Sequence, residues 1–363
     1  MAERNTYVAD FSLALINRTG AYHICNDLVR DLAPYFDQVR YWRLPFQPQP
    51  TLLRKVVGRA MLAELATLKD CATLARAHPR QPVLYMDPLY VLRTELRPED
   101  IVLCHDVGPI THPDLFEPDV VRLYRLAYDK MARVKPGVVV VSDFTGSEFR
   151  RLYGEPRFLT TCRLYARPAI AANDTAPVQG VEGPFLLTVG ALEKRKNYLR
   201  VIEAYRRSGL YEKGVHYVFC GARTHFAPEI LKAARNTPGV HPLGYVSEQQ
   251  LRWLFQAASG FVLVSLLEGF GLPALEAAQL GLASIVSAGT VQEEVMGGAA
   301  LLADPHNIES IAASMVKLHA LSPDEKNELI ARGRAQAASI PYSRYIAGFE
   351  KILAANAAPT EPI

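Results

Sequence analysis

The stretch Glu268-Gly-Phe-Gly-Leu-Pro-Ala-Leu-Glu276 decides the fold of this chain of 363 residues. It follows an apolar run at residues 261–265 that is typical of a buried strand. The two glycines favour a turn, Pro273 suits the start of a helix, and Gly281 suits its C-terminal end. A strand, a glycine loop and a helix present main-chain N–H groups and a positive helix end at one point, which favours an anion such as phosphate.

The two glutamates of this stretch need a different partner, because carboxylates repel phosphate. Glu268 precedes the loop and Glu276 lies near the start of the predicted helix. Both suit hydrogen bonds from hydroxyl groups. Phosphate and hydroxyls together indicate a nucleotide sugar. Taken alone, the two acids also fit an ordinary helix start, since short motifs carry false positives.

Composition predicts a globular protein of two domains. Hydrophobic residues make up 49% of the chain and charged residues 21%, and the net charge of +3 argues against a dedicated nucleic-acid binder. The five cysteines form no C-x-x-C pair, so neither a zinc site nor a disulfide framework is predicted, and a reducing cytoplasm is the expected location. We find no signal peptide and no apolar run approaching the ~18 residues of a membrane span. Any membrane link is therefore expected to be peripheral, at the inner face.

Strand patterns alternate with helix patterns along the whole chain, which predicts an α/β protein with two doubly wound parallel sheets facing a cleft. We place an N-terminal domain at residues 1–170, a C-terminal domain at 171–340, and a last helix with a disordered tail at 341–363. Local sequence patterns also predict a strand at 39–44, a helix at 53–76, a capping box from Thr145 to Glu148, and a linker at 167–183.

A cluster of three cations lies between a predicted strand and a predicted helix. Lys194, Arg195 and Lys196 follow Gly190 and precede a helix that starts at Tyr198. Cations are unfavourable at a helix N-terminus unless an anion is bound there, and both side chains pair strongly with phosphate. A solvated loop is the alternative.

His105 and Asp106 follow a compact buried-strand pattern at residues 100–104. Ligands of open parallel sheets bind at the carboxyl ends of the strands, so His105 is well placed for one. A satisfied core histidine is the alternative. Arg54, Lys55 and Arg59 begin the predicted helix at 53–76, and they indicate either a solvated face or a patch for an acceptor or a membrane surface.

The stretch 268–276 resembles the donor-site motif of retaining glycosyltransferases of family 4. Three further segments are similar to motifs of this family and occur in its order: H-D with a later H-P at 105–113, G-x-L-E-x-R-K-N at 190–197, and E-V-x-G-x-A-A-L-L-x-D-P at 294–305. The first of them resembles a mannosyltransferase-like subset. The resemblance implies the GT-B fold, with two Rossmann-like domains. Ala191 departs from the arginine of many members, and residues 164–167 replace a usual Asn-Gly turn.

The resemblance also implies roles. It makes His105, Arg195, Lys196 and Glu268 catalytic: His105 contacts the transferred sugar at its 6-hydroxyl, the two cations hold the donor diphosphate, and Glu268 accepts from sugar hydroxyls. Glu276 binds the ribose, and Asp106 lies beside the acceptor. The donor-binding residues by this resemblance are Gly20, Gly190, Arg195, Lys196, Tyr245, Gly269, Phe270, Gly271, Leu272 and Glu276.

The implied reaction moves a hexose from a nucleotide sugar to a hydroxyl of a glycan or lipid-linked acceptor, by same-face attack. Mannose from GDP-mannose is the favoured donor, with UDP- and dTDP-sugars as alternatives. No metal or other cofactor is expected, because side-chain cations neutralise the leaving diphosphate. The competing hypotheses are a nucleotide-sugar epimerase or a phosphorylase on the same architecture, and a nucleotide-sugar-binding protein without catalysis.

Overall fold

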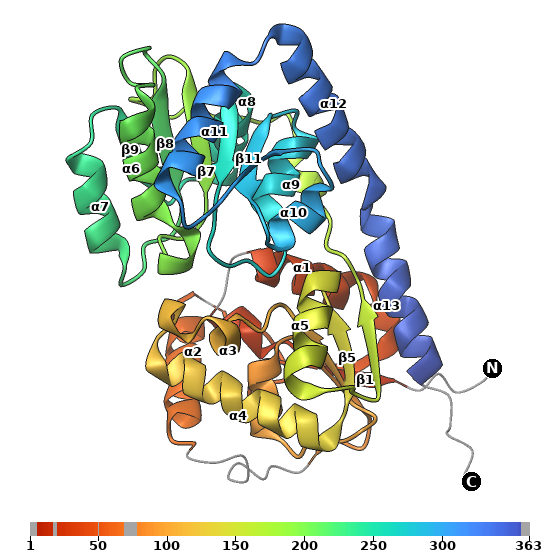
Figure 1. Ribbon diagram of the computed structural model, residues 1–363. Helices are drawn as coiled ribbons and strands as arrows, with labels where there is room; N and C mark the ends of the chain where they lie inside the picture. The colour runs from red at the N-terminus through yellow and green to blue at the C-terminus, as the bar shows by residue number, and fades with distance from the viewer. Residues whose placement is uncertain (1–5, 17–19, 50, 69–77, 357–363) are drawn as a thin grey trace. The chain divides into compact units, whose positions relative to one another are not determined.

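Two compact units make up the protein, whose computed structural model describes residues 6–16, 20–49, 51–68 and 78–356 (Figure 1). Unit 1 extends to Leu164 and includes the chain again from Ser343 onward, and unit 2 covers Tyr165–Tyr342. The division falls shortly before the position 170 expected from the sequence. Thr19, residues 69–76 of the helix predicted at 53–76, and the predicted tail beyond residue 356 lie outside the described residues. No helix of the described part is both long and apolar enough to cross a membrane.

Unit 1 is built on six parallel strands with helices between them. The strands are β1 (Tyr7–Asp10), β2 (Phe36–Arg40), β3 (Val83–Tyr85), β4 (Ile101–Cys104), β5 (Gly137–Val140) and β6 (Phe158–Thr161). The α-helices are α1 (Gly20–Asp31), α2 (Thr51–Ala66), α3 (Gly108–Thr111), α4 (Pro118–Val134), α5 (Asp143–Tyr153) and α13 (Tyr342–Asn356). Short 3-10 helices are η1 (Ser12–Leu15), η2 (Ala33–Tyr35), η3 (Pro88–Arg93) and η4 (Pro113–Leu115).

The strand order in unit 1 is β2-β1-β3-β4-β5-β6, and every pairing is parallel. The order reverses direction between β1 and β3, so the chain leaves these neighbours on opposite faces of the sheet and opens a site at their carboxyl ends. Helix α13 returns to this unit: the Tyr7 hydroxyl donates to the carbonyl of Leu353 at 2.9 Å, and the Asn356 amide to that of Glu99 at 2.8 Å.

Two edge strands of unit 1 differ from the sequence prediction. The strand expected at 39–44 is β2, which begins at Phe36 and ends at Arg40. It is paired on one side only, so polar residues are tolerated in it, while the apolar residues after it form a turn in which Trp42 has a positive φ of 61°. No strand was predicted at β6, which is the other edge strand and is largely half-buried.

Two helix starts in unit 1 also differ from the prediction. Helix α2 begins at Thr51, two residues before the predicted start, and ends at Ala66. The capping box predicted from Thr145 to Glu148 is wrong. Ser142 is the N-cap of α5, and its hydroxyl accepts from the N–H of Thr145 at 3.1 Å. A serine directly after a buried strand satisfies the free N–H groups one turn earlier than the threonine would.

Unit 2 repeats the plan of alternating strands and helices. Its strands are β7 (Phe185–Val189), β8 (His216–Cys220), β9 (Val240–Gly244), β10 (Gly260–Leu263), β11 (Ser284–Ser287) and β12 (Leu301–Ala303). Its α-helices are α6 (Tyr198–Ser208), α7 (Ala227–Arg235), α8 (Glu248–Ala257), α9 (Leu272–Gln279), α10 (Val291–Met296), α11 (Ile308–Ala320) and α12 (Pro323–Ser339), with 3-10 helices η5 (Pro168–Ala171) and η6 (Lys194–Lys196).

The strand order in unit 2 is β12-β11-β10-β7-β8-β9, again entirely parallel. This is the Rossmann order, in which the first and fourth strands are neighbours and the direction of winding reverses between them. These neighbours are β7 and β10. The segments after them carry the cation cluster and the stretch 268–276, so the topology itself brings the two predicted motifs together.

Both faces of the unit 2 sheet are buried, which explains why its strands are apolar at successive positions. On β7, Leu186 packs into a core beneath α6, α7 and α11, whereas Phe185 and Leu187 pack into a second core beneath α8, α9 and α10. Figure 1 shows these helices around the sheet. Ser247 and Gln250 form a capping box at the start of α8.

Candidate active site

The loop between β10 and α9 is shaped by its second glycine. Gly271 has a φ of +91° and is the N-cap of α9, with Pro273 as the second helical residue. A side chain is strained at that φ, and a Cβ there would also lie 3.2 Å from Cγ of Gln292. Gly281, at φ +82°, follows the last turn of the helix as predicted. The glycines therefore fix where the helix starts and how closely its N-terminus can be approached.

Glu268 lies just before this loop and is held by three side chains. It is 8% exposed. Lys196 Nζ lies 2.5 Å from its Oε1, Arg195 Nη1 lies 3.3 Å from its Oε2, and the hydroxyl of Ser265 donates to Oε1 at 2.8 Å. The two predicted motifs thus meet in a direct ion pair.

The charge state of Glu268 follows from these partners. Burial alone would raise its pKa, but the charges of Lys196 and Arg195 outweigh burial and hold the pKa of Glu268 below its usual value. The carboxylate is therefore ionised at neutral pH. The anion that the sequence analysis required beside the cations is, in this structure, the chain's own Glu268.

Hydrogen bonds lock the cation segment onto the segment after β10. The N–H of Leu266 donates to the carbonyl of Arg195 at 2.8 Å. The side-chain amide of Asn197 donates to the carbonyls of Val264 at 3.0 Å and Pro305 at 2.8 Å. Asn197 has a φ of 62°, so η6 ends abruptly and α6 begins directly after it. A Cβ at Gly190 would lie 3.2 Å from Cε of Lys196, so this glycine makes room for the buried lysine.

Glu276 is the second acid of the motif, and it pairs with a residue that the sequence did not point to. It is 2% exposed. Arg167 Nε donates to its Oε1, and Arg167 Nη2 to its Oε2 at 3.3 Å. A third carboxylate, Glu248, lies 3.7 Å from Arg167 Nη1. The signal that could have revealed Arg167 is the departure from the family pattern at residues 164–167.

Gln292 is a second residue that the sequence analysis missed. Its side chain is 1% exposed. Its Oε1 accepts from the N–H of Ser287 at 3.1 Å, which orients the amide. Its Nε2 is buried and makes no hydrogen bond among the described residues, and a Cβ on Gly271 would lie 3.7 Å from it. A buried donor without a partner is costly, so Gln292 is suited to bind a ligand atom at the glycine loop.

In unit 1, His105 and Asp106 lie beyond β4, as the strand pattern predicted. His105 Nε2 donates to the carbonyl of Met86 at 2.9 Å, which places Met86, beyond the neighbouring strand β3, against the ring. Asp106 Oδ1 accepts from the N–H of Gly108 at 2.8 Å and so shapes the turn into α3. His112, by contrast, is exposed, and its Nδ1 lies 2.8 Å from the hydroxyl oxygen of its neighbour Thr111.

Asp87, which the sequence analysis missed, is a buried acid in the same region. Its Oδ1 accepts from the N–H of Leu89 at 2.8 Å and from the hydroxyl of Tyr124 at 3.0 Å. Burial raises the pKa of Asp87, and the charge of His105 and these hydrogen bonds offset burial only in part. An acid two residues after the short strand β3 was the available signal.

The remaining predicted residues are spread over both units. Gly20 is the first residue of α1, and Tyr245 is 83% exposed after β9. The side chain of Phe270 is only 3% exposed, so its main chain is the part suited to a ligand. Gly269 and Leu272 flank it and are half-buried. The described residues contain no group of three or more His, Cys, Asp or Glu side chains that could hold a metal ion.

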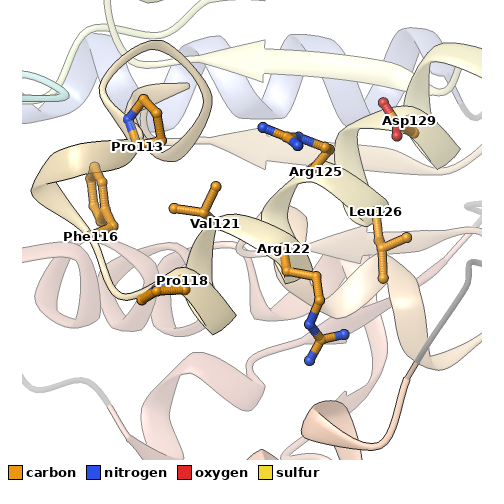
Figure 2. A pocket seen from close by; sticks show the side chains of 8 residues that line it. All are labelled: Pro113, Phe116, Pro118, Val121, Arg122, Arg125, Leu126 and Asp129. Carbon is orange, nitrogen blue, oxygen red and sulfur yellow. The ribbon is translucent and has the colours of Figure 1, made fainter.

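A pocket of about 410 Å³ lies along α4 of unit 1 (Figure 2). It is lined by Pro113, Phe116, Pro118, Val121, Arg122, Arg125, Leu126 and Asp129. Its walls are therefore apolar with two arginines and one aspartate, and none of the predicted site residues contributes to it.

The arrangement in unit 2 is chemically suited to a diphosphate. Two cations are held on the β7 side, and the glycine loop and the N-terminus of α9 lie on the β10 side of the Rossmann switch point. Both features bind phosphate oxygens. The buried carboxylates Glu268 and Glu276 add acceptors for hydroxyl groups.

Comparisons with known proteins agree with this geometry. The family model described as glycosyl transferases group 1 matches residues 173–336. The O-antigen chain mannosyltransferase B of Escherichia coli is 30% identical over 267 residues, which are 70% of this chain and 69% of that protein. The GDP-mannose:cellobiosyl-diphosphopolyprenol alpha-mannosyltransferase of Komagataeibacter xylinus is 30% identical over 148 residues, 39% of this chain and 37% of that protein.

A solved structure shows the same fold. The sucrose-phosphate synthase of Thermosynechococcus elongatus superposes with a TM-score of 0.69 at 14% identity, covering 96% of this chain and 98% of that one. The two sheets described above are those of the GT-B architecture predicted from the sequence. The chain belongs to the glycosyl transferases group 1, the family 4 glycosyltransferases with mannosyltransferase relatives.

Proposed function

We propose that this glycosyltransferase moves mannose from GDP-mannose to a hydroxyl of a glycan or lipid-linked acceptor, with retention of the anomeric configuration. The observation that carries the proposal is the buried ion pair of Lys196 and Arg195 with Glu268 at the Rossmann switch point of unit 2. Two relatives support the donor and the acceptor class, because one is an O-antigen chain mannosyltransferase and the other a GDP-mannose:cellobiosyl-diphosphopolyprenol alpha-mannosyltransferase.

In this proposal the donor diphosphate takes over the cations that Glu268 holds in the structure. Phosphate oxygens carry more charge than a single carboxylate, so Lys196 and Arg195 bind them more strongly. Glu268 is then available to accept from sugar hydroxyls, Glu276 from ribose hydroxyls, and the Gln292 amide to donate at the glycine loop. His105 and Asp106 of unit 1 serve the transferred sugar and the acceptor.

The proposed transfer accounts for every bond, electron pair and proton without a cofactor. The bond between the sugar C1 and the diphosphate oxygen breaks, and its electron pair leaves with the diphosphate, where Lys196 and Arg195 stabilise the developing charge. The acceptor oxygen attacks C1 on the face that the diphosphate leaves. The acceptor proton passes to a phosphate oxygen of the departing group, so no protein nucleophile is required.

A thermal-shift screen of nucleotide sugars tests the donor, because a ligand that binds only the folded state stabilises it by mass action. We expect GDP-mannose to raise Tm and to do so more than UDP-glucose or dTDP-glucose at equal concentration. A larger rise with one of the latter two would make the donor assignment wrong. NMR of the product of transfer to a synthetic acceptor tests retention, and an inverted anomer would contradict it.

The transfer assay, run with and without acceptor, separates the competing hypotheses. A transferase consumes the donor only when acceptor is present, whereas an epimerase converts it without acceptor. Glu268→Ala is expected to abolish transfer, because the variant lacks the carboxylate that orients the sugar and leaves Lys196 buried without its close partner. Near-normal rates in this variant would defeat the role of Glu268.

A further inference from the structure

Two tyrosines of unit 1 lie close to Asp87, and they differ in how they use their hydroxyl groups. The Tyr124 hydroxyl, from α4, donates to the Asp87 carboxylate and lies 3.0 Å from Oδ1 and 3.1 Å from Oδ2. Tyr90, in η3, is 0% exposed, and its hydroxyl makes no hydrogen bond within the described part of the chain. Its main-chain N–H donates to the Asp87 carbonyl at 3.2 Å. Only Tyr124 therefore anchors the Asp87 side chain.

Asp87 is held by two elements at once. It is the N-cap of η3, where its Oδ1 accepts from the N–H of Leu89 at 2.8 Å, and it accepts from Tyr124 of α4. The carbonyl of Met86 shares one rigid peptide plane with the nitrogen and Cα of Asp87. The N–H of Met86 donates to the carbonyl of Asp10 in β1 at 3.2 Å. These contacts together fix the direction in which the Met86 carbonyl points.

The Met86 carbonyl in turn sets the protonation pattern of the His105 ring. It lies 2.9 Å from Nε2, and because a carbonyl oxygen can only accept, Nε2 carries the hydrogen. The thiol of Cys25, whose pKa is raised by burial, donates to the same carbonyl at 3.8 Å. In the neutral ring Nδ1 is then an acceptor. No described residue makes a hydrogen bond to Nδ1, and the side chain is half-buried.

We propose that Tyr124 and Asp87 are positioning residues for His105: they hold the Met86 carbonyl on Nε2 and thereby leave Nδ1 to accept a hydrogen from a substrate hydroxyl. This inference rests on the proposed function, in which His105 serves the transferred sugar. It adds a chemical requirement at one atom, because Nδ1 then suits a group that donates an O–H hydrogen. A phosphate or carboxylate oxygen, which only accepts, does not meet that requirement.

The alternative is that Asp87 acts on His105 through its charge. Two observations favour position over charge. Both carboxylate oxygens of Asp87 are directed at the Tyr124 hydroxyl, and Oδ1 also at the N–H of Leu89. Burial raises the pKa of Asp87, and the charge of His105 and the hydrogen bonds offset burial only in part. Burial therefore disfavours the charged form that this alternative requires.

Tyr124→Phe and Tyr90→Phe form a matched pair, because each removes one hydroxyl near Asp87 and only the first removes a hydrogen bond. We expect Tyr124→Phe to lower kcat/KM for transfer about tenfold, short of the ~100-fold that a 1 Å misplacement can cost. Tyr90→Phe is expected to transfer like the wild type. Circular dichroism and Tm establish that both variants are folded at the assay temperature. A folded Tyr124→Phe variant with wild-type kinetics would overturn the proposal.

Asp87→Asn and Asp87→Ala separate position from charge. The amide oxygen of asparagine keeps an acceptor for Leu89 and Tyr124 but carries no charge, whereas alanine loses both. We expect Asp87→Asn to keep most of the wild-type kcat/KM and Asp87→Ala to lose more than about tenfold. Equal losses in the two variants would assign the effect of Asp87 to its charge and overturn its positioning role.

NMR of protein with 15N-labelled histidines tests the tautomer directly and needs no donor. Chemical shifts distinguish protonated from unprotonated ring nitrogens, and comparison with His105→Gln identifies the signals of His105 among the nine histidines. At about pH 8.5, two units above the ordinary histidine pKa, we expect a protonated Nε2 and an unprotonated Nδ1 in the wild type and in Tyr90→Phe. In Tyr124→Phe we expect a mixture of both tautomers.

A wild-type ring protonated at Nδ1 would overturn the proposal even if the enzyme transfers mannose. Conversely, the expected tautomer in a protein that does not use GDP-mannose would leave the positioning of His105 intact and refute only the donor. The NMR and transfer experiments therefore distinguish failure of this inference from failure of the proposed function.

Discussion

Glu268 in unit 2 and Asp87 in unit 1 are both buried acids beyond the carboxyl end of a strand, yet their pKa values are shifted in opposite directions. The pKa of Glu268 is lowered, because Lys196 and Arg195 outweigh burial. The pKa of Asp87 is raised, because burial outweighs its hydrogen bonds and the charge of His105. Burial therefore does not set the charge of an acid by itself, since the partners decide whether desolvation is compensated.

The difference separates two kinds of site. In unit 2 the cations Lys196 and Arg195 are paired with the carboxylate of Glu268. In the proposed function a donor diphosphate replaces this carboxylate as their anionic partner. Unit 1 positions His105 and Asp87 mainly through main-chain groups and a tyrosine hydroxyl, which suits the recognition of neutral hydroxyl groups.

Lys196→Met is expected to have the largest effect. It leaves Glu268 buried with only Arg195 as a charged partner, at a cost of about 3–5 kcal/mol in the free energy of unfolding. It also removes a charge that stabilises the leaving diphosphate in the proposed reaction, which we expect to lower kcat/KM about 1000-fold, at the upper end for the loss of one such group. Denaturant unfolding and steady-state kinetics measure the two effects.

Lys194→Met is the matched control, because Lys194 is the exposed member of the same cation cluster. It is expected to change kcat/KM less than about tenfold. The double variant Lys196→Met/Glu268→Gln is expected to regain stability but not activity. Full activity in Lys196→Met would contradict the assignment of the diphosphate to this lysine.

Glu268→Gln and Asp87→Asn are expected to change the pH dependence of stability with opposite signs. The folded-state pKa of Glu268 lies below its unfolded value, so its contribution is present above the unfolded pKa and is lost as pH falls through the folded pKa. The folded-state pKa of Asp87 lies above its unfolded value, so Asp87 lowers stability as pH rises between the two. Unfolding free energies measured from pH values below the usual carboxyl pKa up to neutral pH show both: the Glu268 effect at the acidic end and the Asp87 effect above it.

The sizes of these two effects should also differ. At neutral pH Glu268→Gln is expected to cost about 3 kcal/mol, because Lys196 is left buried beside a neutral amide. Asp87→Asn is expected to change stability by less than about 1 kcal/mol, since the amide oxygen keeps the acceptor for Leu89 and Tyr124. If Asp87→Asn were as costly as Glu268→Gln, the contrast between the two units would be wrong.

Arg167→Ala extends the contrast to the second acid of the motif. Arg167 holds Glu276 through two hydrogen bonds, so its loss leaves a buried carboxylate free to turn away from a ribose. We expect the KM for the donor to rise about tenfold with a smaller change in kcat, as for the loss of one well-oriented charge-assisted contact. Arg167→Lys is expected to recover part of the KM, which a purely structural role would not predict.

Arg167 and Lys196 also show where sequence reasoning ends. The glycines, the acids and the cations of unit 2 could be assigned from the sequence, because each lies in a short segment whose local pattern carries its own physical signal. Their pairing could not, because Lys196 lies 72 residues from Glu268 and Arg167 lies 109 residues from Glu276. Only the strand order β10-β7 makes the first pair neighbours, and periodicity says nothing about strand order.

The edge strands show a second limit of prediction from the sequence. Buried strands such as β7 and β10 were predicted within one or two residues, because burial on both faces leaves a continuous apolar run. The edge strands β2 and β6 carry polar and half-exposed residues, so their composition resembles that of a loop. Asp87 was missed for a different reason, because its contacts with Leu89 and Tyr124 are not shown by any local sequence pattern.

His78→Gln tests whether an ion pair in unit 1 behaves like the one in unit 2, and its expected effect is smaller than that of Glu268→Gln. His78 Nε2 lies 2.9 Å from Asp100 Oδ2, and its Nδ1 donates to the carbonyl of Pro79 at 2.6 Å. Burial lowers the pKa of His78, but the hydrogen bonds to Asp100 and Pro79 outweigh it and raise the pKa overall. The folded-state pKa therefore lies above the unfolded one, and the stabilisation is fully present below the unfolded pKa and lost as pH rises through the folded pKa.

Replacement by glutamine is expected to cost about 1.5 kcal/mol at acidic pH, as for a hydrogen bond to a charged group, and less at alkaline pH. His112→Gln, at an exposed histidine, is the control and should leave the pH profile of unfolding unchanged, whereas a constant difference between wild type and His78→Gln at all pH values would show that the pair is neutral.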